Sequence, residues 1–515
     1  MEKSGEFRRG WPVLAAASVG IGLGMSPLPF YTIGVFIPPL LAEFGGQGWD
    51  VGFIINALAV YTFGSMAAAP IIGILAEKFG ARRVALVSII TFSLSLMAIS
   101  LNTGSKSLYI LLWLLLAMSG VGTLPITFTR PVANWFKANR GIALGIALIT
   151  TGVFGALAKY FAQFMVQHSD WRLAYVAVGC LPLVISLPLS LVALRDVDDV
   201  PASESALTRF KIPILMVSFI GALGFSGIVI SQVLESIAKN GLRFEYVLPF
   251  AYMPLVFIPV VCMLLFKVGT KPPEVKKHDN GEAVILPGMT LREALRSWRF
   301  WLLAICFVPI SYAVGAVIPN IEQVLTQSGM GMDEAVGLAT LTGLAVLGGR
   351  VIGGFLIDRF WAPAVAFTFL ASPAFALWLL GHPDVNANTA TIAILMIGFG
   401  AGVEYDFMAY MVSKYFGMRA YSAIYGSIYA FFGMGAGLGP GIMTNLANGS
   451  GIKLIEWETG LLLGKDWQFT LTTAGIILFV STVPLLFLGR YRYTEEGDHA
   501  EAIAEAEETV ETAHA

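Results

Sequence analysis

The chain has 515 residues, of which 56% are hydrophobic and only 13% are charged, and its mean hydropathy is +0.75. Soluble globular proteins carry about 25% charged residues, so these values exclude an ordinary soluble protein. A disordered chain, which needs low hydrophobicity, is excluded as well. The net charge of −2 gives no basic excess that would indicate a nucleic-acid partner. Three cysteines in apolar runs suggest neither a disulfide framework nor a metal site, and we expect no cofactor; they are Cys180, Cys262 and Cys306.

Long apolar runs decide the fold class. A helix needs about 20 apolar residues to cross a hydrocarbon core of about 30 Å. The runs lack the alternation of barrel strands, so we expect helices. The sequence predicts an all-α polytopic membrane protein with about 14 transmembrane helices. The predicted spans are residues 11–40, 51–76, 82–101, 107–129, 141–166, 171–194, 212–236, 244–267, 299–323, 334–357, 362–380, 389–412, 421–446 and 468–489.

The lysines and arginines indicate how the chain lies in the membrane. Basic residues concentrate in cytoplasmic loops, and most of those in this chain fall in segments on the same side of the predicted spans as the N-terminus. We therefore expect a multi-pass integral protein of the plasma (inner) membrane with both termini in the cytoplasm. The first run is far longer than a signal-peptide core and lacks an evident cleavage site, so we expect it to remain as the first helix.

Short motifs recur in the same order in the two halves of the chain, which indicates pseudo-symmetry. The paired segments are 73–78 (GILAEK) with 354–359 (GFLIDR), 134–140 with 414–419, and 170–172 with 466–468. We expect two six-helix bundles with a two-helix insert between them. The predicted divisions are an N-terminal bundle (1–195), a cytoplasmic loop with the inserted pair (196–268), a cytoplasmic linker with a short amphipathic helix (269–298), a C-terminal bundle (299–492) and an acidic cytoplasmic tail (493–515).

The first of these repeats resembles the signature of the major facilitator superfamily, Gly-x-x-x-Asp-Arg-x-Gly-Arg-Arg/Lys, which lies between helices 2 and 3. Gly73, Gly80 and Arg82 match it, Glu77 and Lys78 are conservative replacements, and the residue after Gly80 departs from it. The resemblance covers essentially the whole chain. It implies the major facilitator fold, in which two six-helix bundles give alternating access to a site between them.

A narrower resemblance is to the monocarboxylate transporter and oxalate/formate antiporter branch. It rests on residues 34–39 (GVFIPP), residues 140–145 (RGIALG), and Arg350 four residues before Gly354. In that branch an arginine at this place binds the anion. The monocarboxylate transporters carry an aspartate four residues before it, where this chain has Val346, so their local proton-coupling pair is not reproduced.

A charged cluster around the loop signature is interpreted as a conformational latch. The carboxylate at the end of the second helix can pair with cations of the following loop and of the helix 4–5 region, which closes the cytoplasmic side in one state. The alternative is that these residues only set the topology, since cytoplasmic loops need basic residues in any case. The predicted latch residues are Gly73, Glu77, Arg82, Arg83, Arg130, Gly354, Asp358 and Arg359.

Arg350 is one of two basic residues inside the predicted spans. It lies 358 − 350 = 8 residues before Asp358, about 12 Å from the cytoplasmic end of its helix. An arginine is always charged and its planar fork matches a carboxylate, so we predict that Arg350 binds the substrate anion. The alternative is a structural counter-ion at a helix interface.

Two carboxyl groups lie in the tenth helix of the superfamily pattern. Asp406, eight residues before Lys414, has the same depth as Arg350 and is its predicted partner, whereas Glu404 lies about 15 Å deep. Residues two apart on a helix point about 200° apart, so the two carboxyls cannot share one face. We predict that both take part in proton coupling, with Glu404 the freer to titrate. The alternative is that both only neutralise arginines.

Further candidates for substrate contact are Lys159, Tyr31 and Tyr61. Lys159 lies about 28 Å along its helix from Arg140, so snorkelling to the outer face is the alternative to anion binding. The two tyrosines belong to helices that would line the N-terminal half of a cavity. The alternative for each tyrosine is ordinary packing.

The sequence predicts a secondary active transporter that moves a small organic anion, monocarboxylate-like and with aromatic acids included, by alternating access coupled to protons. The alternatives are a drug or metabolite exporter of the same superfamily and an anion exchanger without proton coupling. No cluster of metal-binding carboxylates or nucleotide-binding loop appears in the sequence, so we do not expect an enzyme or a primary pump. The expected partners are the organic anion, protons and the lipid bilayer; the oligomeric state is left open.

Overall fold

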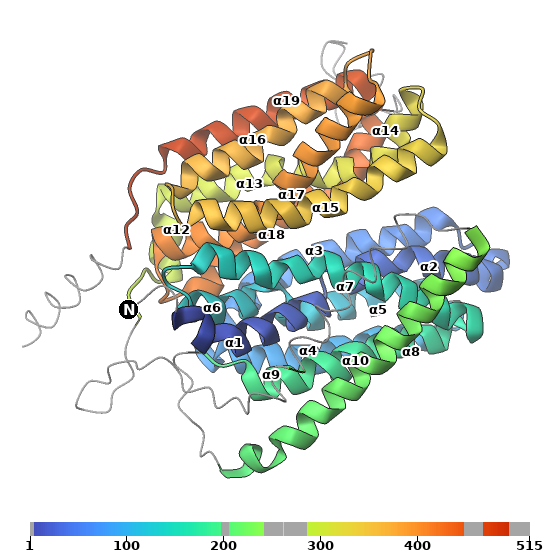
Figure 1. Ribbon diagram of the computed structural model, residues 1–515, viewed down its shortest axis with the longest axis horizontal. Helices are drawn as coiled ribbons and strands as arrows, with labels where there is room; N and C mark the ends of the chain where they lie inside the picture. Colours follow the sequence, from blue (N-terminus) through green and yellow to red (C-terminus); the bar gives the residue numbers. More distant parts are fainter. Residues whose placement is uncertain (1–4, 197–204, 241–260, 262–285, 448–466, 494–515) are drawn as a thin grey trace, which may run out of the picture.

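The computed structural model describes residues 5–196, 205–240, 261, 286–447 and 467–493. Apart from one isolated β-bridge, this part of the chain forms helices and their connections. Figure 1 shows two groups of roughly parallel helices, one from the first half of the chain in blue and teal and one from the second half in yellow to red. The predicted all-α fold with two helical bundles is confirmed.

The N-terminal bundle runs from α1 to α9, and several of its membrane crossings consist of two or three helical pieces in succession. Its elements are α1 (Gly5–Gly22), α2 (Leu28–Phe44), η1 (Gly45–Gln47), α3 (Val51–Phe79), α4 (Ala81–Ala98), η2 (Ile99–Leu101), α5 (Lys106–Gly120), η3 (Val121–Thr123), α6 (Pro125–Trp135), α7 (Arg140–His168), α8 (Trp171–Leu181), η4 (Pro182–Ser186) and α9 (Leu187–Ala193).

The long helix α10 (Ser205–Asn240) follows, and the C-terminal bundle comes after it. The elements of the second half are α12 (Leu291–Arg296), α13 (Trp298–Val317), η5 (Ile318–Asn320), α14 (Ile321–Gln327), α15 (Met332–Ile357), α16 (Ala362–Leu380), α17 (Ala387–Phe416), α18 (Tyr421–Ala447), α19 (Trp467–Thr482) and η6 (Val483–Phe487).

Twelve helices of the described residues are long and apolar enough to cross a membrane. The sequence predicts fourteen, and the second helix of the predicted insert, residues 244–267, lies outside the described residues. The first helix of the insert is α10, which runs along the outside of the N-terminal bundle (Figure 1). There the Ser218 hydroxyl donates a 2.8 Å hydrogen bond to the Ile185 carbonyl, and the rings of Phe161 and Phe225 lie 5.3 Å apart.

The first crossing is broken, so the prediction of one continuous helix over residues 11–40 is wrong. α1 ends at Gly22 and α2 begins at Leu28, directly after Pro27. Proline has no N–H to donate and its ring clashes with the preceding turn. The five residues between the two helices therefore cross the middle of the bundle as irregular backbone.

Neighbouring side chains satisfy the backbone at this break. The Met25 N–H donates to the Thr123 hydroxyl at 2.8 Å, and the Met25 carbonyl accepts a hydrogen bond from the Tyr61 hydroxyl at 2.5 Å. Irregular backbone at membrane depth is tolerated only where protein or a water-filled cavity supplies such partners. The break is thus a built feature of the bundle.

The helix ends define two faces of the molecule. We call the end that carries the start of α1 the terminal face, which lies on the left in Figure 1, and the other end the opposite face. Loops 136–139, 358–361 and 417–420 belong to the terminal face, whereas loops 48–50 and 102–105 belong to the opposite face.

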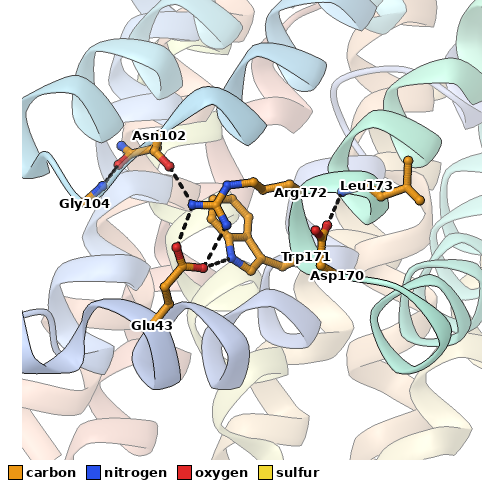
Figure 2. A network of polar contacts seen from close by, with 7 residues as sticks. All are labelled: Glu43, Asn102, Gly104, Asp170, Trp171, Arg172 and Leu173. Carbon is orange, nitrogen blue, oxygen red and sulfur yellow. Dashed lines mark hydrogen bonds and ion pairs between the residues drawn. The ribbon is translucent and has the colours of Figure 1, made fainter.

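At the opposite face, one carboxylate joins three segments of the N-terminal bundle (Figure 2). Glu43, at the end of α2, accepts hydrogen bonds from the Arg172 guanidinium at 2.6 and 2.9 Å and from the Trp171 indole at 2.6 Å. Arg172 also donates to the Asn102 carbonyl at 3.3 Å, and Asp170 caps α8. This network fixes the end of α2 to the start of α8.

The linker enters the C-terminal bundle through α12, the short helix expected there. Thr290 and Glu293 form the capping box that their spacing predicts. Just before it, Gly288 and Gly417 form a β-bridge, in which the Met289 N–H donates to the Phe416 carbonyl at 2.8 Å. The two glycines have φ angles of +149° and +76°, a region that L side chains rarely adopt. The linker is therefore tied to the loop that opens α18.

Candidate functional site

The two bundles meet along two helix pairs, α3 with α18 and α7 with α15. Glycines allow the backbones to touch. A Cβ atom on Gly354 would lie 2.6 Å from the Gly141 carbonyl oxygen, and one on Gly145 would lie 2.7 Å from the Arg350 carbonyl oxygen. A Cβ on Gly73 would collide with the backbone of Ser422 in the same way. Small residues at helix interfaces permit this close approach. Gly73 and Gly354 thus contribute to the contact between the bundles by packing, and their part in a latch stays a prediction.

Each bundle caps a helix of the other bundle at the terminal face. Asp358, at the end of α15, accepts hydrogen bonds from the N–H groups of Gly141 (2.7 Å) and Ile142 (3.0 Å) at the start of α7. Glu77, near the end of α3, accepts a 2.7 Å hydrogen bond from the Ser422 N–H at the start of α18. Helix N-termini carry free N–H groups and positive partial charge, so a carboxylate stabilises them.

This arrangement is reciprocal because Glu77 and Asp358 occupy equivalent places in the sequence repeat. Burial raises the pKa of the Asp358 carboxyl, and the two N–H donors partly offset this effect. The bundles must break these hydrogen bonds in order to separate at the terminal face.

Glu77 belongs to a buried network of ion pairs within the N-terminal bundle. The Arg130 guanidinium lies 2.6 Å from Glu77 and 3.0 Å from Asp196, and the Asn134 amide donates to Asp196 at 2.6 Å. The sequence interpretation missed Asp196, which lies just after α9 and shares no short-range motif with Arg130. Its one sequence signal was a carboxylate directly after a predicted span.

The remaining predicted latch cations lie elsewhere. Arg82 donates to the Leu191 carbonyl at 2.7 Å, because its position in the first turn of α4 directs it towards α9. Arg83 is exposed. Arg359 is also exposed; it lies 3.4 Å over the Phe355 ring and donates to the carbonyl of the same residue. Of the three cations expected around Glu77, the structure brings only Arg130 to it among the contacts of the described residues.

Two further side-chain contacts join the bundles at the terminal face. Arg140 donates to the Ser413 hydroxyl at 2.9 Å, and Tyr421 donates to the Thr129 hydroxyl at 3.2 Å. Together with the reciprocal caps, they close the terminal face in this conformation.

Deeper in the interface, three ionisable side chains are buried without satisfied hydrogen bonds. Nη1 of Arg350 lies 3.8 Å from a carboxylate oxygen of Asp406, which is beyond hydrogen-bonding distance. Nε and Nη1 of Arg350, Oε1 of Glu404 and both carboxylate oxygens of Asp406 form no hydrogen bond within the described part of the chain. Arg350 and Asp406 are only 3% and 2% exposed. Unmade hydrogen bonds of buried charged groups are costly.

Arg350 pairs with the carboxylate that the sequence placed at the same depth in the membrane. Asp406 is the ion-pair partner of Arg350, and it also faces the other bundle, since a Cβ on Gly145 would lie 3.6 Å from its carboxylate. Glu404 forms no ion pair within the described part of the chain, although the charge of Arg350 also acts on it. The roles of both carboxyls in coupling remain predictions.

Aromatic side chains surround this charged group, and the sequence interpretation overlooked most of them. The Tyr405 ring lies 4.7 Å from Phe432 and 5.9 Å from Tyr429. Tyr429 stacks on Tyr405 and, across the interface, lies within electrostatic reach of Ser26 at the helix break. A broken helix in one bundle therefore faces an aromatic cluster in the other. No sequence signal joins Ser26 to Tyr429, because their relation exists only in the assembled fold.

The predicted tyrosines have different environments. Tyr31 is 44% exposed, lies within electrostatic reach of Arg350, and packs its ring against the backbone of α7 at Gly155. A Cβ at Gly155 would lie 2.5 Å from that ring. Tyr61 is 1% exposed and its hydroxyl is used by the Met25 carbonyl. The structure therefore leaves Tyr31 exposed and within electrostatic reach of Arg350, whereas the Tyr61 hydroxyl is buried and already bonded.

Lys159 is exposed and lies on the side of α7 that faces the C-terminal bundle. It follows Gly141 by 18 residues, which is five helical turns, and Gly141 packs against α15. However, it lies about 21 Å along the helix from Gly145, the residue that touches the backbone of Arg350. Lys159 therefore lies far along the interface from Arg350 in this conformation, and its contact with the anion stays a prediction.

Exposed residues continue along α2 beyond Tyr31. Tyr31, Gly34 and Pro38 share one side of α2 and are all exposed, and nothing lies within 4 Å of a Cβ built on Gly34. At Gly34, this side of α2 is therefore not covered by the described part of the chain.

Similarity to known proteins agrees with this geometry. The family model described as Major Facilitator Superfamily matches residues 19–266 and 215–440. The chain belongs to the major facilitator superfamily. Its homologues and fold are those of transporters, so it is a multi-pass membrane transporter and not an enzyme.

Among relatives, the chain is 26% identical over 338 residues to the uncharacterized MFS-type transporter YhjX of Escherichia coli (strain K12), covering 61% of this chain and 79% of that one. It is 22% identical over 425 residues to the gallate transporter of Pseudomonas putida, covering 79% and 82%. It is 31% identical over 188 residues to monocarboxylate transporter 13 of Bos taurus, covering 36% and 40%. These relatives support secondary transport of small organic substrates.

Among solved structures, the chain resembles the proton:xylose symporter XylE with a TM-score of 0.61 at 13% identity, covering 94% of this chain and 96% of that one. It resembles the human organic anion transporter MFSD10 with a TM-score of 0.58 at 14% identity, covering 92% and 99%. At such identities these likenesses establish the major facilitator fold alone.

Proposed function

We propose that this chain is a proton-coupled secondary transporter of small organic monocarboxylates, aliphatic or aromatic, that works by alternating access in the plasma (inner) membrane with both termini in the cytoplasm. One observation carries the proposal: the buried guanidinium of Arg350 has Nε and Nη1 without a hydrogen bond among the described residues, and the exposed Tyr31 of the other bundle lies within reach of its charge. Buried donors without partners favour a ligand that supplies acceptors.

The substrate carboxylate is assigned to Arg350. A guanidinium can donate two parallel hydrogen bonds to a carboxylate, and such bonds are strong in a low-dielectric interior. The Asp406 carboxylate at 3.8 Å is too far away to satisfy the guanidinium. A second carboxylate can therefore take the unused donors without first breaking a well-formed pair.

The apolar part of the substrate is assigned to a position between aromatic side chains of the two bundles. Tyr31 on α2 and the half-buried Tyr405 on α17 belong to opposite bundles, and both lie within reach of the charge of Arg350. Aromatic side chains favour flat apolar groups through stacking or edge contacts. Aromatic acids therefore fit this site as well as short aliphatic acids do.

Charge balance supports proton coupling. If Asp406 and Glu404 were both ionised, Arg350 and one bound carboxylate would leave the site with a net charge of 1 − 3 = −2. Uncompensated charge is expensive at membrane depth. Protonation of Glu404 and Asp406 removes that excess, so a proton that enters with the substrate stabilises the loaded site.

Release on the terminal side is assigned to separation of the reciprocal caps. Asp358 and Glu77 would exchange helix N–H donors for water as the bundles rock apart. The opposite face would close as this happens, because α2 and α7 present open surfaces there.

The proposal is tested by counterflow of radiolabelled benzoate and lactate into proteoliposomes. The assay is run with and without a pH gradient in which the outside is more acidic than the inside. We expect native protein to exchange the acids and to accumulate them when the gradient is applied. Arg350→Ala should abolish exchange. Glu404→Gln should retain exchange but lose accumulation driven by the gradient.

Arg9→Gln, which removes an exposed arginine that belongs to no proposed site, is the matched control and should behave as the native chain does. Undiminished exchange by Arg350→Ala would contradict the anion site. Accumulation that ignores the gradient would indicate an exchanger without proton coupling. Movement of cationic drugs alone would instead indicate the exporter.

A further inference from the structure

Exposed arginines and tryptophans gather where the linker enters the C-terminal bundle at the terminal face. Arg292 and Arg296 of α12 are exposed and have no ion-pair partner among the described residues. Trp298 and Trp301, in the first turn of α13, are 53% and 44% exposed. None of these four side chains serves the substrate site or the closure described above.

The end of the C-terminal bundle adds two more cations to this surface. Arg299 donates to the Leu488 carbonyl at 3.0 Å, which places the exposed Arg490 and Arg492 next to the start of α13. Glu293 of α12 lies within electrostatic reach of Arg492, so α12 and this segment are neighbours. One carboxylate therefore stands among at least four exposed guanidinium groups.

The surface is held rigidly. The Trp301 indole donates to the Leu295 carbonyl at 2.9 Å, which ties α13 back to α12. The Arg299 guanidinium lies 5.2 Å over the Trp298 ring. The capping box of Thr290 and Glu293 fixes the start of α12. A preorganised set of donors loses little conformational entropy on binding.

We propose that this surface, the α12 patch, binds the phosphate headgroup of an anionic phospholipid; it consists of Arg292, Arg296, Trp298, Trp301, Arg490 and Arg492. Guanidinium groups match phosphate oxygens, and basic helices at the membrane surface attract anionic lipids. Tryptophan settles at the level of the headgroups. The exposed indoles beside the arginines favour a lipid over a soluble anion, because a soluble anion would leave them in water.

The α12 patch is joined to the closure of the terminal face. The β-bridge between Gly288 and Gly417 links the linker to the loop that opens α18, whose Ser422 N–H donates to Glu77. A lipid that holds α12 at the membrane surface therefore acts on a segment that must move when the bundles separate. Transport should depend on the anionic lipid content through this connection.

The test measures retention of phosphatidylglycerol by the purified full-length protein, by native mass spectrometry from mixed phosphatidylglycerol and phosphatidylcholine nanodiscs. The Arg292→Gln/Arg296→Gln double variant should lose retention by about fivefold for each arginine removed. The matched control is Lys78→Gln/Lys137→Gln, which removes the same charge from exposed positions at the terminal face of the N-terminal bundle. It should retain the lipid as the native chain does.

A second measurement is the dependence of benzoate counterflow on phosphatidylglycerol content, which should flatten in the α12 variant and persist in the control. Equal loss of lipid in both double variants would show only a diffuse attraction to the leaflet and would overturn the proposal. Unchanged retention in the α12 variant would do the same. Equally tight binding of glycerol 3-phosphate would assign the patch to a soluble anion. Folding is checked by monodispersity in gel filtration, and loss of lipid counts only in monodisperse protein.

Discussion

The closure at the terminal face and the buried charges near the middle of the interface use the same residue types in opposite ways. At the terminal face, Arg130 is paired at 2.6 Å and Asp358 accepts two N–H bonds. Deeper in the interface, Arg350 and Asp406 stand 3.8 Å apart with unused hydrogen-bonding atoms. A network held by ion pairs of 2.6 and 3.0 Å stabilises one conformation, whereas the loosely paired charges at 3.8 Å are available to a ligand and a proton. Residue identity alone does not distinguish the two; hydrogen-bond geometry does.

The largest effect is expected when Arg130, the cation shared by Glu77 and Asp196, is removed. Arg130→Ala leaves the buried Glu77 and Asp196 carboxylates without their shared cation, so we expect the free energy of unfolding to fall by about 3–5 kcal/mol. Asp406→Asn should lower it by less than Arg130→Ala does, because the Asp406 oxygens accept no hydrogen bond within the described residues and the Glu404 carboxyl still lies within reach of the charge of Arg350. Thermal unfolding midpoints in detergent measure both. A larger loss in Asp406→Asn than in Arg130→Ala would reverse the comparison.

An intermediate effect concerns the close backbone contact that permits the closure. Gly354→Ala inserts a methyl group 2.6 Å from the Gly141 carbonyl oxygen, so the closed terminal face should become less populated. Gly343→Ala on the same helix meets nothing within 4 Å and is the matched control. Distances between spin labels at the exposed positions 83 and 419 should lengthen only in Gly354→Ala. Identical distance distributions in both variants would show that this contact does not limit closure.

The smallest effect is expected at the opposite face. Arg172 and Glu43 form a good pair, but their side chains are 35% and 39% exposed. Exposed ion pairs contribute about 0–1 kcal/mol, so Arg172→Gln should barely move the unfolding midpoint. A loss as large as that of Arg130→Ala would mean that burial does not separate the two kinds of network.

Much of the fold was predictable because a membrane crossing must be about 20 apolar residues long. The predicted span 362–380 coincides with α16, and the repeat of Gly73 and Glu77 in Gly354 and Asp358 identified equivalent places in the two bundles. The break between α1 and α2 was missed. Pro27 and the neighbouring glycines are signals for it, but the whole run is apolar and was therefore interpreted as one helix.

The site was predictable only in part. A charged residue inside an apolar run, such as Arg350, is easily recognised in the sequence. Equal depth on two helices indicated Asp406 as its partner. The partners of Glu77 and Asp358 are backbone N–H groups, which every residue but proline carries and which therefore leave no sequence pattern. The contact of Tyr429 with Ser26 depends on how the two bundles pack, which no local spacing encodes.

Equilibrium binding of radiolabelled benzoate to the purified protein tests the central claim most directly, because it needs neither a gradient nor the rocking of the bundles. Saturable binding should appear in the native chain and in Arg9→Gln, disappear in Arg350→Gln, and survive in Glu404→Gln. Native-like binding by a folded Arg350→Gln would contradict the claim that this guanidinium holds the substrate carboxylate.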